Sequence, residues 1–132
     1  MLRKIKVSEY MAANLITFKP EMEMRLAIEH LVDKRISGAP VVDDHGNLVG
    51  VLSEQDCVKM ALTAGYHGDL GGLVKEFMSP KVTTIDADTS ILDLAQLFID
   101  APFRRYPVLQ NGRLVGQISR RDVLRALRSI GT

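Results

Sequence analysis

Residues 40–56, PVVDDHGNLVGVLSEQD, decide the fold of this chain because they join two apolar runs through a polar turn. The runs Ala39–Val42 and Leu48–Leu52 have the length and the β-branched content of short strands. The segment between them is rich in aspartate, glycine and asparagine, which favour turns. The stretch ends on a serine and an aspartate, and it predicts two strands joined by a turn and followed by a helix over 54–64.

The same pattern returns as PVLQNGRLVGQISRRD at residues 107–122, 67 positions later at the proline and 66 at the aspartate. The one-residue gap falls at His45. The second turn contains Asn111-Gly112, which favours a tight hairpin because both residues tolerate positive φ. The match extends towards the N-terminus, where Val7–Met11 aligns with Val74–Met78. Chance rarely keeps glycine, proline, serine and aspartate in register over such a length, so the chain is an internal duplication.

Each copy predicts the element order βαββα behind a short helical turn, so the expected fold class is α/β (α+β). The first copy is expected to have a turn at 8–11, strands at 15–18, 39–42 and 48–52, and helices from Met24 and over 54–64. The second is expected to have a turn at 74–78, strands at 82–85, 106–109 and 114–118, and helices over 91–99 and 120–130.

The repeats divide the chain into a first domain at 1–64, a glycine-rich linker at 65–73 and a second domain at 74–132. Neither repeat is large enough to bury a core without help. We therefore expect two pseudo-symmetric βαββα units that pack sheet to sheet as one module.

Each copy resembles a CBS domain (named after cystathionine β-synthase), and the tandem resembles the paired unit called a Bateman module. The resemblance covers about Val7 to Leu127, and its most specific part is Pro-Val, a polar turn and Leu-Val-Gly-x-(apolar)-Ser-x-x-Asp. It implies that the pair binds adenosyl ligands, such as AMP, ADP, ATP or S-adenosylmethionine, in clefts between the copies. It also implies dimerisation into a flat disc and regulation of a fused or separate partner.

The pairs Ser53/Asp56 and Ser119/Asp122 are the central candidates for ligand binding. A serine that ends a strand just before a helix lies beside free backbone N–H groups, which suit phosphate. The aspartate three residues on faces the same way and can accept both hydroxyls of a ribose. The same Ser-x-x-acid pattern is close to a helix capping box, which stabilises a helix by about 1 kcal/mol without any ligand. The repetition inside the family pattern favours ligand binding alongside capping.

The resemblance adds residues around these pairs, because in the family the first strand and the residues just before Pro-Val line the ligand cleft. The predicted ligand-binding residues are Thr17, Ala39, Pro40, Ser53, Asp56, Thr84, Arg105, Tyr106, Pro107, Ser119, Arg120, Arg121 and Asp122. Strand propensity alone explains Thr17 and Thr84 equally well. Gly50 and Gly116 can mark a close backbone approach.

The two copies differ in charge at these positions. The second copy has two arginines between its serine and aspartate and two more before Pro-Val, where the first copy has none. Guanidinium groups offer several fixed donors to phosphate. We therefore expect the Asp122 site to bind phosphorylated ligands tightly, and the Asp56 site to be weak or to select a less anionic ligand. Arg125 and Arg128 are interpreted as a solvated helix face.

Composition and motifs exclude several classes. Cys57 is the only cysteine, so neither an intramolecular disulfide nor a cysteine-based metal cluster is possible, and we interpret it as a core residue. The three histidines have no partner at metal-ligand spacing, so no metal site is predicted. Apolar runs fall far short of the roughly 20 residues of a membrane span, and residues 1–7 do not resemble a signal peptide, so we expect a cytoplasmic protein. Phosphate-loop and esterase motifs are missing, so no catalytic residues and no enzyme activity are predicted.

One stretch points to a partner chain. Residues 91–99, ILDLAQLFI, are apolar nearly all the way round a helix, which predicts burial on more than one side and hence a homodimer. The predicted function is a stand-alone regulatory module that binds an adenosine nucleotide, requires no cofactor and signals to a separate, unidentified protein. The alternatives are a ligand-free dimeric scaffold and nucleic-acid binding through the arginines, which the net charge of +1 does not favour.

Overall fold

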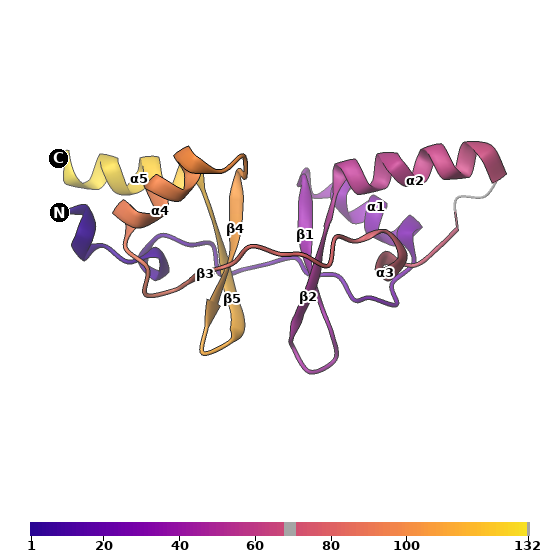
Figure 1. Cartoon of the computed structure of the whole chain (residues 1–132), viewed down its shortest axis with the longest axis horizontal. Helices are drawn as coiled ribbons and strands as arrows, with labels where there is room; N and C mark the ends of the chain where they lie inside the picture. The colour runs from indigo at the N-terminus through magenta and orange to yellow at the C-terminus, as the bar shows by residue number, and fades with distance from the viewer. Residues whose placement is uncertain (68–70, 132) are drawn as a thin grey trace. The chain divides into compact units, whose positions relative to one another are not determined.

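The computed structural model describes residues 1–67 and 71–131, and it divides into two compact units that cut across the sequence repeats (Figure 1). Unit 1 consists of Met1–Leu15 with Thr83–Thr132, and unit 2 of Ile16–Val82. The opening segment of the first repeat, residues 1–15, therefore belongs to the unit that holds most of the second repeat. The opening segment of the second repeat, residues 74–82, belongs to the unit that holds most of the first. The linker expected at 65–73 lies within unit 2 rather than between two units, and its residues 68–70 lie outside the described part.

Unit 2 is an antiparallel hairpin covered by helices. Its elements are α1 (Met24–Asp33), β1 (Gly38–Val42), β2 (Leu48–Ser53), α2 (Glu54–His67) and α3 (Val74–Phe77). The strand predicted at 15–18 is reduced to a bridge, in which the Phe18 N–H donates to the Pro40 carbonyl at 2.9 Å and the Phe18 carbonyl accepts from the Val42 N–H at 2.9 Å. The core of this unit centres on the buried side chains of Phe18, Met24, Leu52 and Val74.

Unit 1 has a three-stranded sheet in the order β3-β4-β5. Its elements are the 3-10 turns η1 (Leu2–Lys4) and η2 (Val7–Glu9), then β3 (Ile85–Asp86), α4 (Ile91–Asp100), β4 (Arg105–Gln110), β5 (Arg113–Ser119) and α5 (Arg120–Ile130). The hairpin predicted at Asn111-Gly112 is confirmed, because both residues have positive φ, 52° and 77°, and Gln110 pairs with Arg113.

The two opening segments are held by apolar burial and by an added strand pairing. Val7 is fully buried in the core of unit 1, and Val74 is fully buried in the core of unit 2. Beyond η2, Ala12 exchanges two hydrogen bonds of 2.9 and 3.0 Å with Gln117 on β5. Beyond α3, the Ser79 backbone makes the equivalent pair with Val51 on β2, at 2.9 and 3.0 Å.

The close approach predicted at the two glycines is made by these segments. A Cβ added to Gly116 would lie 2.7 Å from the Met11 sulfur and 2.8 Å from the Ala12 carbonyl oxygen. A Cβ added to Gly50 would meet Met78 and Ser79 at the same distances. Each glycine therefore lets the opening segment lie flat against a strand, and the approaching group is the chain itself rather than a ligand.

The longer turn of the first repeat is held by a side chain instead of a positive-φ pair. Asp43 Oδ1 accepts hydrogen bonds from the backbone N–H groups of His45 and Asn47, both at 2.9 Å. These bonds favour the ionised carboxylate, and the Asn47 N–H contributes most to a pKa below the ordinary value for Asp43. The inserted residue His45 thus changes the turn from a tight hairpin to an aspartate-capped loop.

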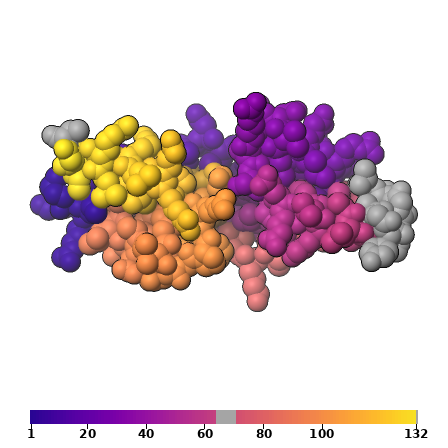
Figure 2. Space-filling model, turned by 90° about the horizontal axis from the view of Figure 1, so that it is seen from above, coloured from indigo at the N-terminus to yellow at the C-terminus, as the bar shows by residue number. Residues whose placement is uncertain are grey.

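Helix α4 begins at a serine cap, where Ser90 Oγ accepts from the Asp93 N–H at 3.1 Å. It buries Ile91, Leu94 and Phe98 in the core of unit 1. Leu92, Leu97 and Ile99 of the same helix are exposed, and Ile99 is 82% exposed. Helix α5 and η1 both contact α4, so the yellow, orange and indigo segments lie together in the space-filling view (Figure 2). Among the described helices, none combines the length and the apolar character needed to cross a bilayer.

Candidate ligand-binding site

Both predicted serine–aspartate pairs form the same hydrogen-bonded junction between a strand and a helix. The Ser53 N–H and hydroxyl donate to Asp56 Oδ2, both at 2.9 Å, and the Asp56 N–H donates back to Ser53 Oγ at 3.2 Å. Ser119 and Asp122 repeat the pattern at 2.9, 3.1 and 3.4 Å. The capping interpretation of the motif is therefore realised in both repeats, and one oxygen of each aspartate is bound by its own chain.

The backbone N–H groups expected to hold phosphate are partly used as well. The first amide of α2, Glu54 N–H, donates to the Ser37 carbonyl at 2.9 Å. The first amide of α5, Arg120 N–H, donates to the Arg104 carbonyl at 3.3 Å. The third amide of each helix belongs to the aspartate and donates to the cap. A ligand phosphate would therefore meet the second amide, at Gln55 or Arg121, and the neighbouring side chains rather than an open helix end.

The second carboxylate oxygen distinguishes the two junctions. Within the residues that the structure describes, Asp56 Oδ1 accepts no hydrogen bond. Asp122 Oδ1 accepts one from Arg125 Nη1 at 3.2 Å, and the same nitrogen donates to the Tyr10 carbonyl at 3.4 Å. The Arg125 guanidinium also lies over the Tyr10 ring, with its carbon 5.5 Å from the ring centroid. Arg125 lies on an exposed helix face, as interpreted from the sequence, but its side chain also joins Asp122 to the opening segment.

The side chain of Tyr106 lies in the core of unit 1. Its side chain is 2% exposed, and its hydroxyl donates to the Leu97 carbonyl at 3.4 Å. The ring packs against Phe98 and Phe103, with centroids 5.1 and 5.7 Å away. The aligned residue Ala39 is equally buried, so packing occupies both of these side chains. The prolines that follow, Pro40 and Pro107, are also buried within their strands.

The remaining predicted residues are accessible. Thr17 and Thr84 are exposed immediately before Phe18 and β3. Arg120 and Arg121 are exposed in the first turn of α5, and Arg105 is half-buried at the start of β4. In the part of the chain that is described, these three arginines form no ion pair, so their guanidinium groups are available to an anion.

The sequence analysis did not predict the contacts of Arg125 with Asp122 and with Tyr10. The spacing of Asp122 and Arg125, three positions apart on a predicted helix, is a signal that could have been used. Tyr10 carries no such signal, because it lies 115 positions from Arg125 and reaches it only through the docking of the opening segment.

Cys57 follows Asp56 in α2 and packs, partly buried, against the core of unit 2, as its apolar surroundings predict. Burial raises the pKa of its thiol, and the nearby carboxylates of Asp56 and Glu54 raise it further. The thiol is thus held in its neutral form, which suits packing rather than nucleophilic chemistry.

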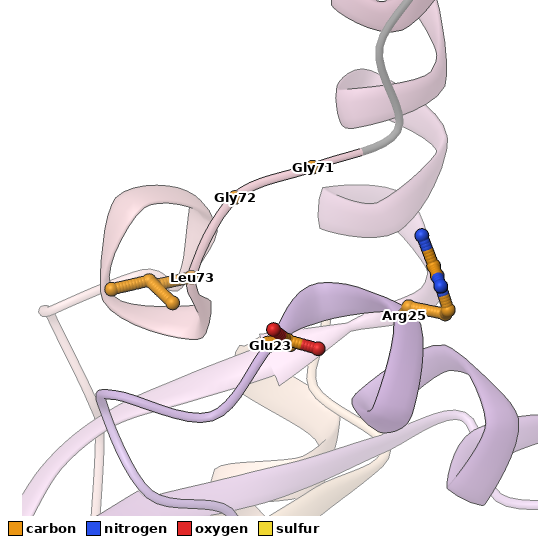
Figure 3. A pocket seen from close by; sticks show the side chains of 5 residues that line it. All are labelled: Glu23, Arg25, Gly71, Gly72 and Leu73. Atoms are coloured by element: carbon orange, nitrogen blue, oxygen red, sulfur yellow. The ribbon is translucent and has the colours of Figure 1, made fainter.

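A separate hollow lies at the start of α1, lined by Glu23, Arg25, Gly71, Gly72 and Leu73 (Figure 3). None of the residues predicted to bind ligand lines it. It is therefore distinct from the strand-to-helix junctions.

Two units with matching strand-to-helix junctions, assembled from interleaved repeats, define the chain as a duplicated α/β module. The model of the CBS domain family matches it twice, at residues 7–62 and 74–129. The chain belongs to this family and is a tandem pair of CBS domains. Its mixed α/β fold is that of solved CBS-pair structures.

Three relatives illustrate the similarity. The structure of CBSX2 in complex with AMP is 31% identical and has a TM-score of 0.84, covering 97% of this chain and 99% of that one; CBSX2 is a chloroplastic protein of Arabidopsis thaliana. The CBS domain pair of protein MJ0100, in complex with 5-methylthioadenosine and S-adenosyl-L-methionine, is 25% identical with a TM-score of 0.76, covering 95% of this chain and 97% of that one. Protein MJ1225 of Methanocaldococcus jannaschii is 31% identical over 93% of this chain, which spans only 43% of its length.

Proposed function

We propose that this CBS pair is a non-catalytic regulatory module that binds an adenosine nucleotide and signals to a separate partner protein. The observation that carries the proposal is the duplicated serine–aspartate junction in a chain 31% identical, over nearly its full length, to a CBS pair that binds AMP. AMP, ADP, ATP and S-adenosylmethionine are the candidate ligands, and no other cofactor is required. The cytoplasmic location stays a prediction of the sequence.

The chemistry of the junction suits a ribose better than a bare phosphate. Asp56 Oδ1 is a charged acceptor with no hydrogen bond from the described residues, and a carboxylate oxygen can accept hydrogen bonds from both hydroxyls of a ribose. Its other oxygen is fixed by the Ser53 cap, so the acceptor is already oriented before a ligand arrives. Thr17 lies exposed in the same unit as a candidate contact to the nucleoside. In unit 1, Arg120 and Arg121 supply cationic donors for phosphate.

Thermal melting in the presence of ligand tests this proposal. A nucleotide at about a hundred times its dissociation constant adds about 2.7 kcal/mol to stability. For a domain of this size that is a rise in Tm of roughly 5–10 °C. We expect AMP to produce such a rise, and the double variant Asp56→Ala/Asp122→Ala to show none. If AMP, ATP and S-adenosylmethionine all leave the Tm of the unaltered protein unchanged, the ligand-free scaffold is the better account.

The proposal includes a homodimer formed through α4 and α5. These adjacent helices carry exposed apolar side chains that a single chain leaves uncovered, at Leu92, Leu97, Ile99, Leu124 and Leu127. A second copy of the chain is the proposed cover because a stretch that is apolar all round its helix needs a second buried face.

Light scattering after size exclusion measures the dimer directly. The unaltered protein is expected at twice its chain mass of 14.6 kDa. Ile99→Asp is expected to raise the dimer dissociation constant at least tenfold, since it buries a charge at the interface. Ile99→Leu, which keeps the apolar volume, is the matched control. A monomeric unaltered protein, or an Ile99→Asp variant that dimerises normally, would remove α4 from the interface.

A further inference from the structure

We infer that Arg125 is a latch that competes with the ligand for Asp122, so that nucleotide fills the Asp56 junction first. The inference rests on the proposed function, in which each aspartate accepts ribose hydroxyls. Arg125 does not itself bind the nucleotide in this scheme. It is a positioning residue that keeps one of the two aspartates occupied while no ligand is bound.

Both oxygens of Asp122 are used by its own chain. Oδ2 accepts from the Ser119 backbone and hydroxyl, and Oδ1 accepts from Arg125 at 3.2 Å. The Asp122 side chain is only 16% exposed, so little room remains for a further donor while the guanidinium stays in place. Oδ1 can accept two hydrogen bonds and Arg125 uses one of them, so a ribose that offers both of its hydroxyls to Oδ1 must displace Arg125.

Arg125 is held by more than the aspartate. Its nitrogen donates to the Tyr10 carbonyl, and its guanidinium lies over the Tyr10 ring at 5.5 Å. Ion pairs between exposed side chains are weak by themselves, but a carbonyl and an aromatic face on the same cation fix its position. Withdrawal of Arg125 breaks all of these contacts together, so occupancy of Asp122 loosens the segment around Tyr10.

The first repeat lacks the latch. Lys59 occupies the position that aligns with Arg125, and Phe77 the position that aligns with Tyr10. Within the described residues, Lys59 forms no ion pair with Asp56, whose Oδ1 stays open. A lysine also lacks the planar fork with which an arginine engages a carboxylate and an aromatic ring together. The order of affinities is therefore the reverse of the one expected from the arginines beside Asp122.

The test isolates the latched junction. In the Asp56→Ala background, AMP and uncharged adenosine are titrated by calorimetry with and without Arg125→Ala. We expect Arg125→Ala to raise the affinity for both ligands about three- to tenfold, the range given by one exposed ion pair and one cation–π contact. Removing a cation would otherwise weaken AMP binding, so a gain separates the latch from a phosphate contact. Arg128→Ala, which removes the same charge from the same helix, is the control and is expected to give no gain.

Hydrogen exchange provides a second readout. In the Asp56→Ala background, saturating AMP is expected to speed amide exchange at residues 10–12, and Arg125→Ala is expected to speed it without ligand. A loss of AMP affinity in Arg125→Ala would make Arg125 a phosphate contact and overturn the latch, and unchanged affinity would overturn it equally. Both results leave the proposed function standing if the unaltered protein binds AMP. If the unaltered protein binds none of the adenosyl ligands, the proposed function and the latch both fall.

Discussion

Gly116→Ala is expected to destabilise the protein by about 2–3 kcal/mol, and Gly50→Ala by a similar amount, because a side chain at either position collides with an opening segment. The alanine Cβ at 116 would lie 2.8 Å from the Ala12 carbonyl oxygen, which is backbone and cannot swing aside. Relief requires the segment to move away from β5. That movement stretches the two hydrogen bonds between Ala12 and Gln117 and pulls Val7 from its buried position.

Chemical denaturation measures this loss, and two further variants make it specific. Gly131→Ala is the matched control, because the nearest atoms to its added Cβ lie 3.7 Å away and its φ is −84°. It is expected to change stability by less than about 0.5 kcal/mol. Adding Met11→Ala to Gly116→Ala removes the sulfur contact but not the carbonyl contact, so it should recover only part of the loss. A Gly116→Ala protein as stable as the Gly131→Ala control would contradict the tight pairing of the opening segment.

Comparison of the two repeats does not predict which opening segment packs into which unit. Val7 and Val74 are aligned valines in aligned segments, so either one would fill either core equally well. Self-comparison shows that the repeats are alike, but it cannot show which core receives which segment. The choice is made by the connections at Leu15 and Val82, where the chain passes from one unit to the other.

Local chemistry was predicted well where a residue's role depends on its neighbours in sequence. The Asn111-Gly112 turn and the strand-to-helix junctions both involve residues within a few positions of one another. Tyr106 is different, because its ring packs against Phe98 and Phe103. The chain folds back between α4 and β4, and hydrophobic periodicity does not predict that contact. The family pattern predicted Tyr106 as a ligand-binding residue, and the structure places its side chain in the core.

Asp56→Ala is expected to weaken AMP binding at least tenfold to a hundredfold, because the loss of even one hydrogen bond to a charged acceptor costs about 1.5–3 kcal/mol. Asp122→Ala is expected to weaken the same measured affinity less than about threefold, since Arg125 already occupies that carboxylate. The charge of the neighbouring arginines alone would predict the opposite order. Calorimetric titration of both variants with AMP therefore compares the two explanations directly.

The two variants control each other for stability. Each loses a capping box of the same design, which contributes about 1 kcal/mol of folding stability, and Asp122→Ala also loses the ion pair with Arg125, which adds less than about 1 kcal/mol. Denaturation without ligand measures both losses. If the two variants are similarly stable, a difference in their AMP affinities reflects lost contacts with the ligand and not a damaged helix. A larger loss of affinity in Asp122→Ala than in Asp56→Ala would mean that phosphate contacts from Arg120 and Arg121 outweigh the contact between Arg125 and Asp122. That result would contradict the latch, because it would show that displacing Arg125 from Asp122 does not measurably weaken AMP binding.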